Sequence, residues 1–510
     1  MVEDSVHGAI RITSEEYVLL QTPFLRRLHE IKQLGLAYLV FPTATHSRLE
    51  HSLGVTHLMH RIVSRVVAKA GADPQLCSAI SSSCSARELS VFVDVSRLAA
   101  LIHDSGHLAF SHATEEALAD LIKRCSSRRS HSSNACKAVK QLEREAERLG
   151  SSFKIHEVYT LHLVEKMAEA VRGESEELSL KILAALETLK STSVEKNEET
   201  WESLGLRRGA LKLVSSLLSN EIYDVDRVDY LVRDARYTGV VYGYIDLDRL
   251  IEGLEVVVRN EEPEVQVTPK ALQSIEDVFD ARFKMYRSVY FHHKLLSIQL
   301  AVSKTLEYIL EEWDSLNPQI YEHLPDPASL LAPSKLAELV SDGLLYFDDN
   351  EMMYVIKLSA MRGSRLLKRW ARSLLHERHL LPVSLIKRTE ELLEDRIAPS
   401  LNLDEALSKL DFEHLSESLA EIVARQLGVE RSDVEVYFSL RRIVDPNAVK
   451  GFELTQYLRA VSRAASTPIL QVYAFSDDER VQRTLYSHRW LLREKCRELM
   501  LEELLSYWRG

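Results

Sequence analysis

LIHDSGHLAFSH, residues 101–112, is the most informative stretch of this sequence. It is apolar overall, yet it carries four titratable side chains, those of His103, Asp104, His107 and His112. Burying several uncompensated polar or charged groups would cost several kcal/mol for each group. A divalent cation removes that cost, because imidazole nitrogens and carboxylate oxygens become its ligands. The stretch therefore indicates a metal site in a helical protein, although a single histidine of this kind is more often a hydrogen-bonded core residue.

Most of the remaining sequence also has a helical pattern. Apolar residues recur at i, i+3, i+4 and i+7 in residues 51–70, 95–107 and 278–306. Strands are predicted in a hairpin over 255–267, around Asn260–Pro263, and at 434–444 and 468–475. We therefore expect a mainly α protein, a helical bundle with a small hairpin and a C-terminal helical and α+β lobe.

Composition limits the class of protein. The 510 residues, 45% of them hydrophobic, can bury at least one large core. The net charge of −12 argues against a general nucleic-acid binder but allows an anionic small-molecule substrate in a locally positive cleft. Five cysteines without a CxxC pair predict reduced thiols and a cytoplasmic protein. The sequence contains neither a secretory signal pattern nor an uncharged apolar run long enough to span a membrane.

The chain is predicted to have two parts. Residues 1–310 would form the catalytic domain, and residues 311–510 a C-terminal helical and α+β lobe. Within the first part, residues 123–137 are rich in Ser and basic residues and have no apolar period, which predicts a mobile insertion. The positive charge of this segment could attract polyanions, but a solvated loop is the simpler interpretation.

The metal site needs ligands from distant segments. His103 and Asp104 are adjacent, so on a helix they point about 100° apart and can contact a cation only from two edges. His51 stands at the start of one predicted helix, and Asp226 at the start of another. Four nitrogen and oxygen ligands leave positions for water and a phosphate oxygen, the open arrangement that a hydrolytic metal needs. We therefore expect His51, His103, Asp104 and Asp226 to bind one divalent ion.

This H…HD…D pattern resembles the signature of the HD-domain phosphohydrolases, an all-helical superfamily. Seven blocks follow one another in family order: HGAI (7–10), TPFLRRLHEIKQLG (22–35), FPTATHSRLEHSLGV (41–55), HDSGHLAFSH (103–112), HE (156–157), DVDRVDYLVRDARYTGV (224–240) and ARFKMYRSVYFHH (281–293). The ordered set is similar to the deoxynucleoside-triphosphate triphosphohydrolase branch. The resemblance is strong over residues 1–310 and loose beyond them.

The remaining histidines suggest proton-transfer roles. His107 lies four residues after His103, so on one helix both would share a face and His107 would overlook the phosphate. The resemblance implies that His112, after the FS step at the end of that helix, and His156 lie at the scissile phosphate, one as proton donor. Glu115, three residues after His112, could orient one of these rings. The alternative for His156 is a surface position on an amphipathic helix.

Two segments suggest substrate contacts next to the metal. Arg48, three residues before His51, would supply a bidentate phosphate clamp. Arg227, Tyr230 and Asp234 follow Asp226 at a spacing that places them on one helix face. These three side chains suit a triphosphate, a sugar ring and a sugar hydroxyl respectively. The alternative is an exposed face of ion pairs.

The resemblance adds a third set of substrate contacts. Arg282, Tyr286 and Tyr290 have the spacing of a single helical stripe. The matching helix of the triphosphohydrolases carries an Arg that binds phosphate and a Tyr against the sugar, and Gln33 matches a residue that binds the sugar 3′-hydroxyl. An aromatic stripe on a helix is otherwise more often part of a core.

The leading expectation is a phosphohydrolase that uses a divalent metal (Mn, Mg, Zn, Fe or Ni) to cleave a dNTP into a deoxynucleoside and inorganic triphosphate. The family commonly forms homo-oligomers, so we expect a dimer or a tetramer. Two alternatives stay open. The same metal could act on a nucleoside monophosphate or a cyclic nucleotide, or the chain could be a non-catalytic nucleotide-binding regulator.

Overall fold

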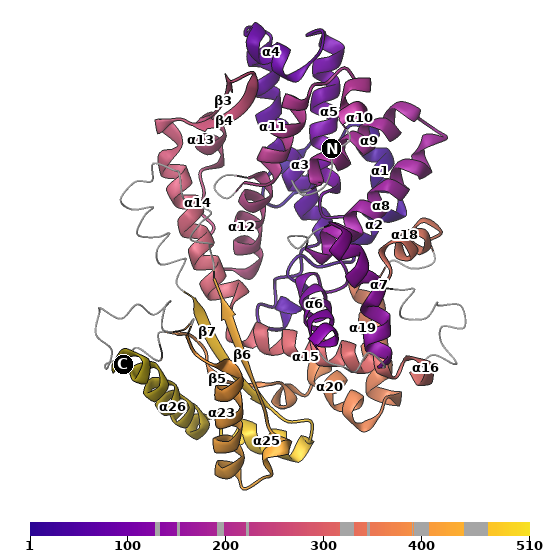
Figure 1. The fold of residues 1–510 in the computed structure, drawn as a ribbon. Coiled ribbons are helices and arrows are strands. Elements are labelled where there is room, and N and C mark those ends of the chain that lie inside the picture. The colour runs from indigo at the N-terminus through magenta and orange to yellow at the C-terminus, as the bar shows by residue number, and fades with distance from the viewer. Residues whose placement is uncertain are drawn as a thin grey trace. The chain divides into compact units, whose positions relative to one another are not determined.

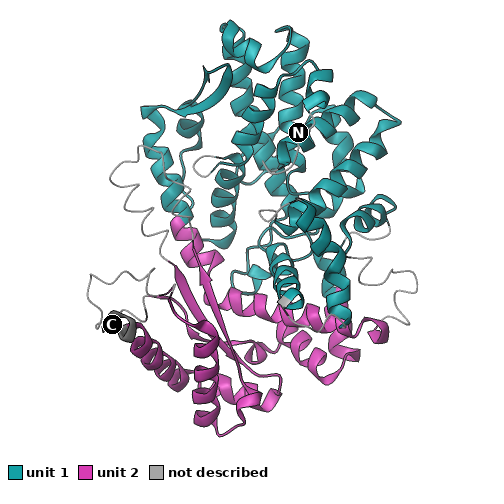
Figure 2. Ribbon diagram, in the orientation of Figure 1, with its two compact units in different colours: residues 1–282, 323–353 teal, residues 283–322, 354–510 magenta. Residues whose placement is uncertain are grey.

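The structure is a computed structural model of the chain. It describes residues 1–127, 133–149, 154–190, 198–220, 224–316, 331–343, 347–389, 391, 407, 409–442 and 468–509. The chain is mainly helical, as predicted, and it forms two compact units (Figure 2). Unit 1 comprises residues 1–282 and 323–353, and unit 2 comprises residues 283–322 and 354–510. The expected division at residue 310 stays a prediction.

Unit 1 is a helical bundle with two antiparallel hairpins (Figure 1). Its helices are α1 (Ser14–Gln21), α2 (Pro23–Arg26), α3 (Arg48–Ala70), α4 (Pro74–Ile80), α5 (Ala86–Ile102), α6 (His112–Ser127), α7 (Asn134–Leu149), α8 (Ile155–Arg172), α9 (Glu176–Leu189), α10 (Glu198–Ser203), α11 (Arg208–Leu218), α12 (Val225–Thr238), α13 (Leu247–Glu252) and α18 (Pro333–Ser341). Its hairpins pair β1 (Val2–Asp4) with β2 (Gly8–Ile10) and β3 (Leu254–Arg259) with β4 (Glu262–Val267). Helices α14 (Leu272–Met285) and α19 (Asp349–Arg362) have residues in both units.

The core of unit 1 lies where α3 packs against α5 and α12. Val55, Met59 and Val63 of α3 are fully buried, as are Leu101 and Ile102 of α5. Burying each large aliphatic side chain contributes roughly 1.5–3 kcal/mol. These contacts bring together the start of α3, the end of α5 and the start of α12, the three places where the predicted metal ligands stand.

The hairpin predicted over 255–267 is confirmed as β3 and β4. Its two turn residues, Asn260 and Glu261, have φ angles of 51° and 66°. Positive φ at both central residues matches the right-handed twist of the flanking strands, which explains a two-residue connection here. Pro263 lies just inside β4.

Unit 2 contains the predicted α+β lobe. Its antiparallel sheet has the order β5 (Val383–Ile386), β7 (Ile469–Phe475) and β6 (Glu435–Arg441). Its helices include α15 (His293–Glu311), α16 (Trp313–Leu316), α20 (Arg365–Leu375), α23 (Phe412–Leu427), α25 (Glu479–Ser487) and α26 (Arg489–Arg509). The sequence predicted β6 and β7 but not β5, and residues 443 and 444 of the first predicted strand lie outside the described residues.

The continuous helix expected over 278–306 is wrong. Helix α14 ends at Met285, a π-helical turn spans Tyr286–Tyr290, and α15 begins at His293. The His292 side chain caps α15 by accepting a hydrogen bond from the backbone N–H of Lys294 at 3.3 Å. A π-turn changes the number of residues per turn, so a stripe predicted for a regular α-helix does not continue across it.

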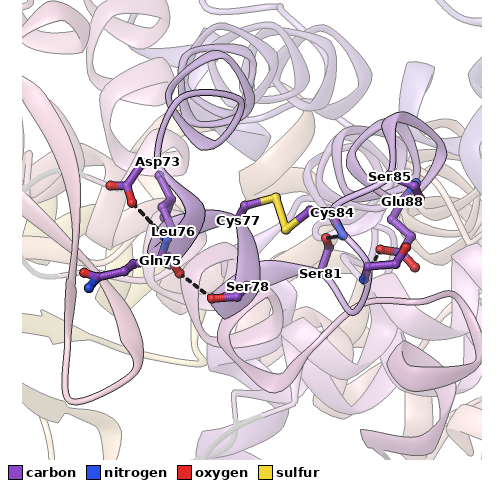
Figure 3. The surroundings of a disulfide bond; sticks show 10 residues. Asp73, Gln75, Leu76, Cys77, Ser78, Ser81, Cys84, Ser85 and Glu88 are labelled. Atoms are coloured by element: carbon purple, nitrogen blue, oxygen red, sulfur yellow. Dashed lines mark hydrogen bonds between the residues drawn. A yellow bond between two sulfur atoms is a disulfide. The ribbon is translucent and has the colours of Figure 1, made fainter.

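The expectation of reduced cysteines is wrong for four of the five residues. Cys77 and Cys84 form one disulfide (Figure 3), and Cys125 and Cys136 form another, each with Cα atoms 5.6 Å apart. The paired cysteines are 7 and 11 residues apart in the sequence, so a search for CxxC does not find them. Cys496 is buried and is not in a disulfide.

The segment 123–137 is partly helical. Its first residues complete α6, and its last residues begin α7, with the Cys125–Cys136 disulfide joining the two helices. Residues 128–132 lie outside the described residues, so the mobility of this insertion stays a prediction. Among the described helices, none combines the length and the apolar composition needed to cross a bilayer.

Candidate functional site

The first turn of α3 places His51. Helix α3 begins at Arg48 because Ser47 and Glu50 form a capping box, each side chain accepting a hydrogen bond from the other's backbone N–H at 3.3 Å. His51 therefore lies in the first turn of α3, where its side chain is fully buried.

Asp226 is placed in the same way by α12. The Asp224 side chain caps this helix by accepting a hydrogen bond from the Arg227 backbone N–H at 2.6 Å. Asp226 then stands in the first turn of α12, which packs against α3. Two local capping motifs thus bring a histidine and a carboxylate from distant parts of the chain to one point.

The HD motif lies at the end of a helix, not inside one. Helix α5 ends at Ile102, so the helix expected over 95–107 is wrong after that residue. The Arg27 guanidinium donates hydrogen bonds to the carbonyl oxygens of Ser105 and His107, each at 2.8 Å, and these replace helical partners. A Cβ atom at Gly106 would lie 2.1 Å from the His156 carbonyl oxygen, so only glycine allows α8 to approach this turn. His107 is therefore positioned by the turn, not by the helical spacing predicted for it.

The structure brings all four predicted metal ligands together. Nε2 of His51 lies 3.0 Å from Oδ1 of Asp226 and 3.7 Å from Oδ2 of Asp104. Nε2 of His103 lies 3.4 Å from Oδ1 of Asp104 and 3.7 Å from Oδ1 of Asp226. Ligand atoms of His51, His103 and Asp226 lie close enough to one another to hold one ion, and Asp104 adjoins this group through its contacts with both histidines.

The donor atoms of this quartet fit a cation. Nδ1 of His51 donates to Oδ2 of Asp229 at 2.8 Å, and Nδ1 of His103 donates to the Ala100 carbonyl oxygen at 2.8 Å. In a neutral imidazole the other nitrogen then carries a lone pair. Nε2 of His103 is buried and has no hydrogen-bond partner among the described residues. A divalent cation would satisfy this nitrogen and the carboxylates opposite it, and the donor set allows several metals.

The charge of the quartet points to the same conclusion. Burial disfavours the ionised forms of Asp104 and Asp226, yet the adjacent His103 holds the pKa of both carboxyls below their ordinary value. Burial also opposes protonation of His51, but Asp226 and Asp229 raise its pKa to about 10. The site therefore attracts positive charge, and a metal must compete with protons for it.

Glu115 accepts hydrogen bonds from all three predicted catalytic histidines. Its Oε1 accepts from Nδ1 of His107 at 2.5 Å, and its Oε2 accepts from Nδ1 of His112 at 3.1 Å and Nδ1 of His156 at 2.9 Å. Burial opposes ionisation of Glu115, but the charges of His107 and His156 hold its pKa well below the ordinary value. These four side chains are also close enough to hold a cation, yet the carboxylate already accepts a hydrogen bond from each ring. Each ring therefore directs its Nε2 atom away from Glu115.

The two clusters adjoin through His107. Its Nε2 lies 3.2 Å from Oδ1 of Asp104, and its ring stacks on the His156 ring with centroids 4.0 Å apart. Burial and the nearby charge of His107 lower the pKa of His156 to about 4, so the His156 ring is neutral near pH 7.

His112 begins helix α6, which corrects the expectation that it ends the preceding helix. The two residues before it, Phe110 and Ser111, have φ angles of 60° and 53° and turn the chain sharply. Its side chain is 58% exposed, whereas the His156 side chain is 10% exposed. His112 is therefore the ring of this cluster that faces solvent.

The predicted phosphate clamp has other partners. Arg48 is buried, and it donates to Oδ2 of Asp104 at 2.6 Å, to Oγ of Ser111 at 3.0 Å and to the Gln33 carbonyl oxygen at 3.4 Å. A guanidinium has five N–H donors, so further donors remain. Arg48 thus holds a metal-ligand candidate in place. Oε1 of Gln33 is buried, and the part of the chain that the structure describes offers it no hydrogen-bond partner.

The substrate residues predicted on α12 differ in environment. Oδ1 of Asp234 is buried and contacts Nε2 of His46 at 2.7 Å. Nη1 of Arg227 donates to the Asn220 carbonyl oxygen at 2.5 Å. The centroid of the Tyr230 ring lies 6.5 Å from that of His51. All three stay predicted contacts.

The third substrate set is divided between the units. Arg282 is buried in unit 1, whereas Tyr286 and Tyr290 belong to unit 2. The two tyrosine rings lie in the π-turn with centroids 4.8 Å apart in an edge-to-face arrangement. Their roles toward a sugar stay predictions.

Sequence reasoning missed the residues that support the site. Asp229 accepts a hydrogen bond from Nδ1 of His51, and Arg27 donates hydrogen bonds to the carbonyl oxygens of Ser105 and His107. Asp349, from a distant segment of unit 1, accepts from the backbone N–H groups of Phe110 at 2.7 Å and Lys32 at 3.1 Å. Only Asp229 left a signal in the sequence, because it lies one helical turn after Asp226.

Comparisons with known proteins agree with this geometry. Residues 48–233 match the family model of the HD domain. An uncharacterized protein of Methanocaldococcus jannaschii is 28% identical over 57% of this chain and 46% of its own length. YwfO, an uncharacterized protein of Bacillus subtilis, is 28% identical over 63% of this chain and 58% of its own length. The deoxynucleoside triphosphate triphosphohydrolase SAMHD1 of Homo sapiens is 28% identical over 57% of this chain and 42% of its own length. The chain thus spans about half the length of the curated relatives it matches.

The fold is also that of a solved phosphohydrolase from Bacteroides thetaiotaomicron. The TM-score is 0.57 at 21% identity, over 93% of this chain and 98% of that one. At this identity the likeness concerns the fold alone. His51, the HD motif and Asp226 all lie within residues 48–233, the segment that matches the HD-domain family model.

Proposed function

We propose that the chain is a metal-dependent phosphohydrolase that cleaves a dNTP into a deoxynucleoside and inorganic triphosphate. One observation carries the proposal. The four metal-ligand candidates lie beside a carboxylate that accepts hydrogen bonds from three histidines, and Asp104 and His107, 3.2 Å apart, join the two clusters. When bound, a divalent cation supplies Lewis-acid polarisation of the phosphate and activation of a water.

The reaction consumes one water, which gives up a proton as it attacks, while the sugar 5′-oxygen gains a proton as it leaves. The water oxygen forms a bond to the α-phosphorus while the bond from that phosphorus to the sugar 5′-oxygen breaks. The leaving oxygen takes a proton. His112 is the suitable donor, because its Nδ1 is held by Glu115 and its ring faces solvent. His156 is less suited, because burial keeps its ring neutral near pH 7.

Two features support a deoxynucleoside triphosphate as substrate. The orphaned Oε1 of Gln33 is a buried acceptor, of the kind that a sugar hydroxyl would satisfy. Relatives named deoxynucleoside triphosphate triphosphohydrolase, from Homo sapiens and Gallus gallus, are 28% and 27% identical to this chain. Arginines at positions 227 and 282 are the candidates for binding the triphosphate, and Tyr230 for packing on the sugar.

A nucleotide panel tests the proposal. The purified chain is incubated with each dNTP, each NTP, a nucleoside monophosphate and a cyclic nucleotide, with Mn²⁺ or Mg²⁺, and the products are separated. Deoxynucleoside and triphosphate in equal amounts are expected from the dNTPs. Release of orthophosphate or pyrophosphate would overturn the triphosphohydrolase assignment, and turnover of the monophosphate or cyclic nucleotide alone would favour another phosphoester. Binding without turnover of any nucleotide would favour a regulator.

A further inference from the structure

Helix α12 contacts the His51 ring through both ring nitrogens. Asp226, in its first turn, faces Nε2 at 3.0 Å, and Asp229, one turn later, accepts from Nδ1 at 2.8 Å. Asp229 is fully buried, and it is not among the four metal-ligand candidates. Its hydrogen bond places the proton of a neutral His51 on Nδ1, so that Nε2 keeps its lone pair.

Asp229 is itself held by four donors. Its Oδ2 accepts from Nδ1 of His51 at 2.8 Å and from Nε of Arg233 at 2.8 Å. Its Oδ1 accepts from Nε2 of His7 at 2.6 Å and from Nη2 of Arg233 at 3.1 Å. A carboxylate with donors on both oxygens cannot rotate without breaking several charge-assisted bonds.

Two residues of the β1–β2 hairpin at the start of the chain support Asp229, one directly and one through Arg233. His7 lies in its turn, and Asp4 ends β1. Asp4 accepts two hydrogen bonds from Arg233, at 2.7 and 3.2 Å, and one from the His7 backbone N–H at 2.8 Å. The side chains of His7, Asp4 and Arg233 are 2%, 6% and 0% exposed. The hairpin is therefore connected to His51 by an unbroken set of buried hydrogen bonds.

Helices α3 and α12 pack closely around this hydrogen-bond network. A Cβ atom at Gly54, one turn after His51, would lie 2.0 Å from Oδ1 of Asp229 and 2.4 Å from Nη2 of Arg233. Glycine at this position allows α3 and α12 to approach closely enough for Asp229 to reach the ring.

From these contacts we infer that the Val2–Ile10 hairpin belongs to the metal centre, with His7 and Asp4 as positioning residues that fix His51 through Asp229 and Arg233. The inference rests on the proposed role of the quartet as a divalent-metal site. It assigns a function to the HGAI block at 7–10, which the proposed reaction does not use.

The test compares variants of the full chain after metal removal. His7→Ala removes the donor, His7→Gln returns an N–H at a similar reach, and Asp4→Asn weakens the Arg233 contact. Glu3→Gln is the matched control, because it makes the same carboxylate-to-amide change on an exposed residue of the same strand. Mn²⁺ affinity is measured by titration calorimetry, the visible spectrum of the Co²⁺-loaded chain reports ligand geometry, and thermal melting reports folding.

We expect Mn²⁺ affinity to fall about 10–100-fold in His7→Ala, the usual effect of losing a residue that orients a metal ligand. Asp4→Asn should lower the affinity less, His7→Gln should restore most of it, and Glu3→Gln should match the parent. The Co²⁺ spectrum should change in His7→Ala and stay parental in His7→Gln. A purely structural role of His7 would not produce this difference.

Two results would overturn the inference. One is parental Mn²⁺ affinity in a folded His7→Ala chain. The other is loss of cooperative melting in both His7→Ala and Asp4→Asn, which would assign the hairpin to folding. A parent chain that binds neither Mn²⁺ nor Co²⁺ would remove the metal site itself and with it the proposed function, so the two failures are distinguishable.

Discussion

Nε2 of His51 lies 3.0 Å from Oδ1 of Asp226, although 175 residues separate them along the chain. Each residue stands in the first turn of its own helix, and the packing of α3 on α12 brings these turns together. His103, at the end of α5, adds a buried nitrogen that has no hydrogen-bond partner in the described part of the chain. Three helix ends thus build the proposed metal site.

Removal of the metal is the first prediction. Treatment with a chelator should abolish phosphohydrolysis, and added Mn²⁺ should restore it. His103→Ala should lower bound metal to well under half of the parental stoichiometry, because it removes one of two imidazole ligands, as elemental analysis can show. His414→Ala changes an exposed histidine of α23 and should keep the parental metal content.

Glu115→Gln should lower kcat by about 100-fold, in the range expected for loss of acid–base catalysis. A neutral amide offers one acceptor atom where the carboxylate serves three imidazole N–H groups, so at least one ring must turn. Metal content should stay parental, since Glu115 contacts none of the four metal-ligand candidates. A variant with parental kcat would show that the three rings need no common acceptor.

His112→Asn tests which histidine gives the proton. Turnover of a dNTP should fall about 10²–10⁴-fold, the usual value of a general acid. An ester with a p-nitrophenolate leaving group needs no proton, so its hydrolysis should fall much less. Equal losses on both substrates would exclude His112 as the proton donor.

The pKa of His156 predicts a pH effect on stability. The folded protein holds this pKa at about 4, below the ordinary 6.5, so the unfolded chain binds more protons between these values. Stability should therefore fall as pH drops from 6.5 toward 4. At about pH 5 the protonation of His156 in the unfolded chain should lower the free energy of unfolding by on the order of 2 kcal/mol. The acid-induced fall in melting temperature should be smaller in His156→Gln than in the parent, whereas His414→Gln should behave as the parent does.

The disulfides can be counted by alkylation. Denatured without reductant, the chain should react at one cysteine, Cys496, and after reduction at all five. Closing loops with sequence separations of 7 and 11 residues should contribute roughly 2–3 kcal/mol each in the chain-entropy account, so Cys77→Ser and Cys125→Ser should each lower the melting temperature. Five alkylated cysteines without reductant would contradict both pairings.

The class of fold could be predicted from the sequence, which also pointed to the four metal-ligand candidates that the structure brings close together. Helical periodicity, scarce glycine and proline, and an ordered set of polar residues in apolar surroundings are local properties, so they can be read without coordinates. The hairpin at 255–267 and strands β6 and β7 were predictable for the same reason.

The contacts that support the site side chains could not be predicted from the sequence and become visible in the folded chain. The helix that should have carried His103 and His107 on one face ends at Ile102, because Arg27 captures the carbonyl oxygens of the following turn. Glu115 serves three histidines where the sequence suggested one, and His7 reaches Asp229 across 222 residues. Such contacts depend on which helices pack together, and packing is set by the whole core rather than by any one segment.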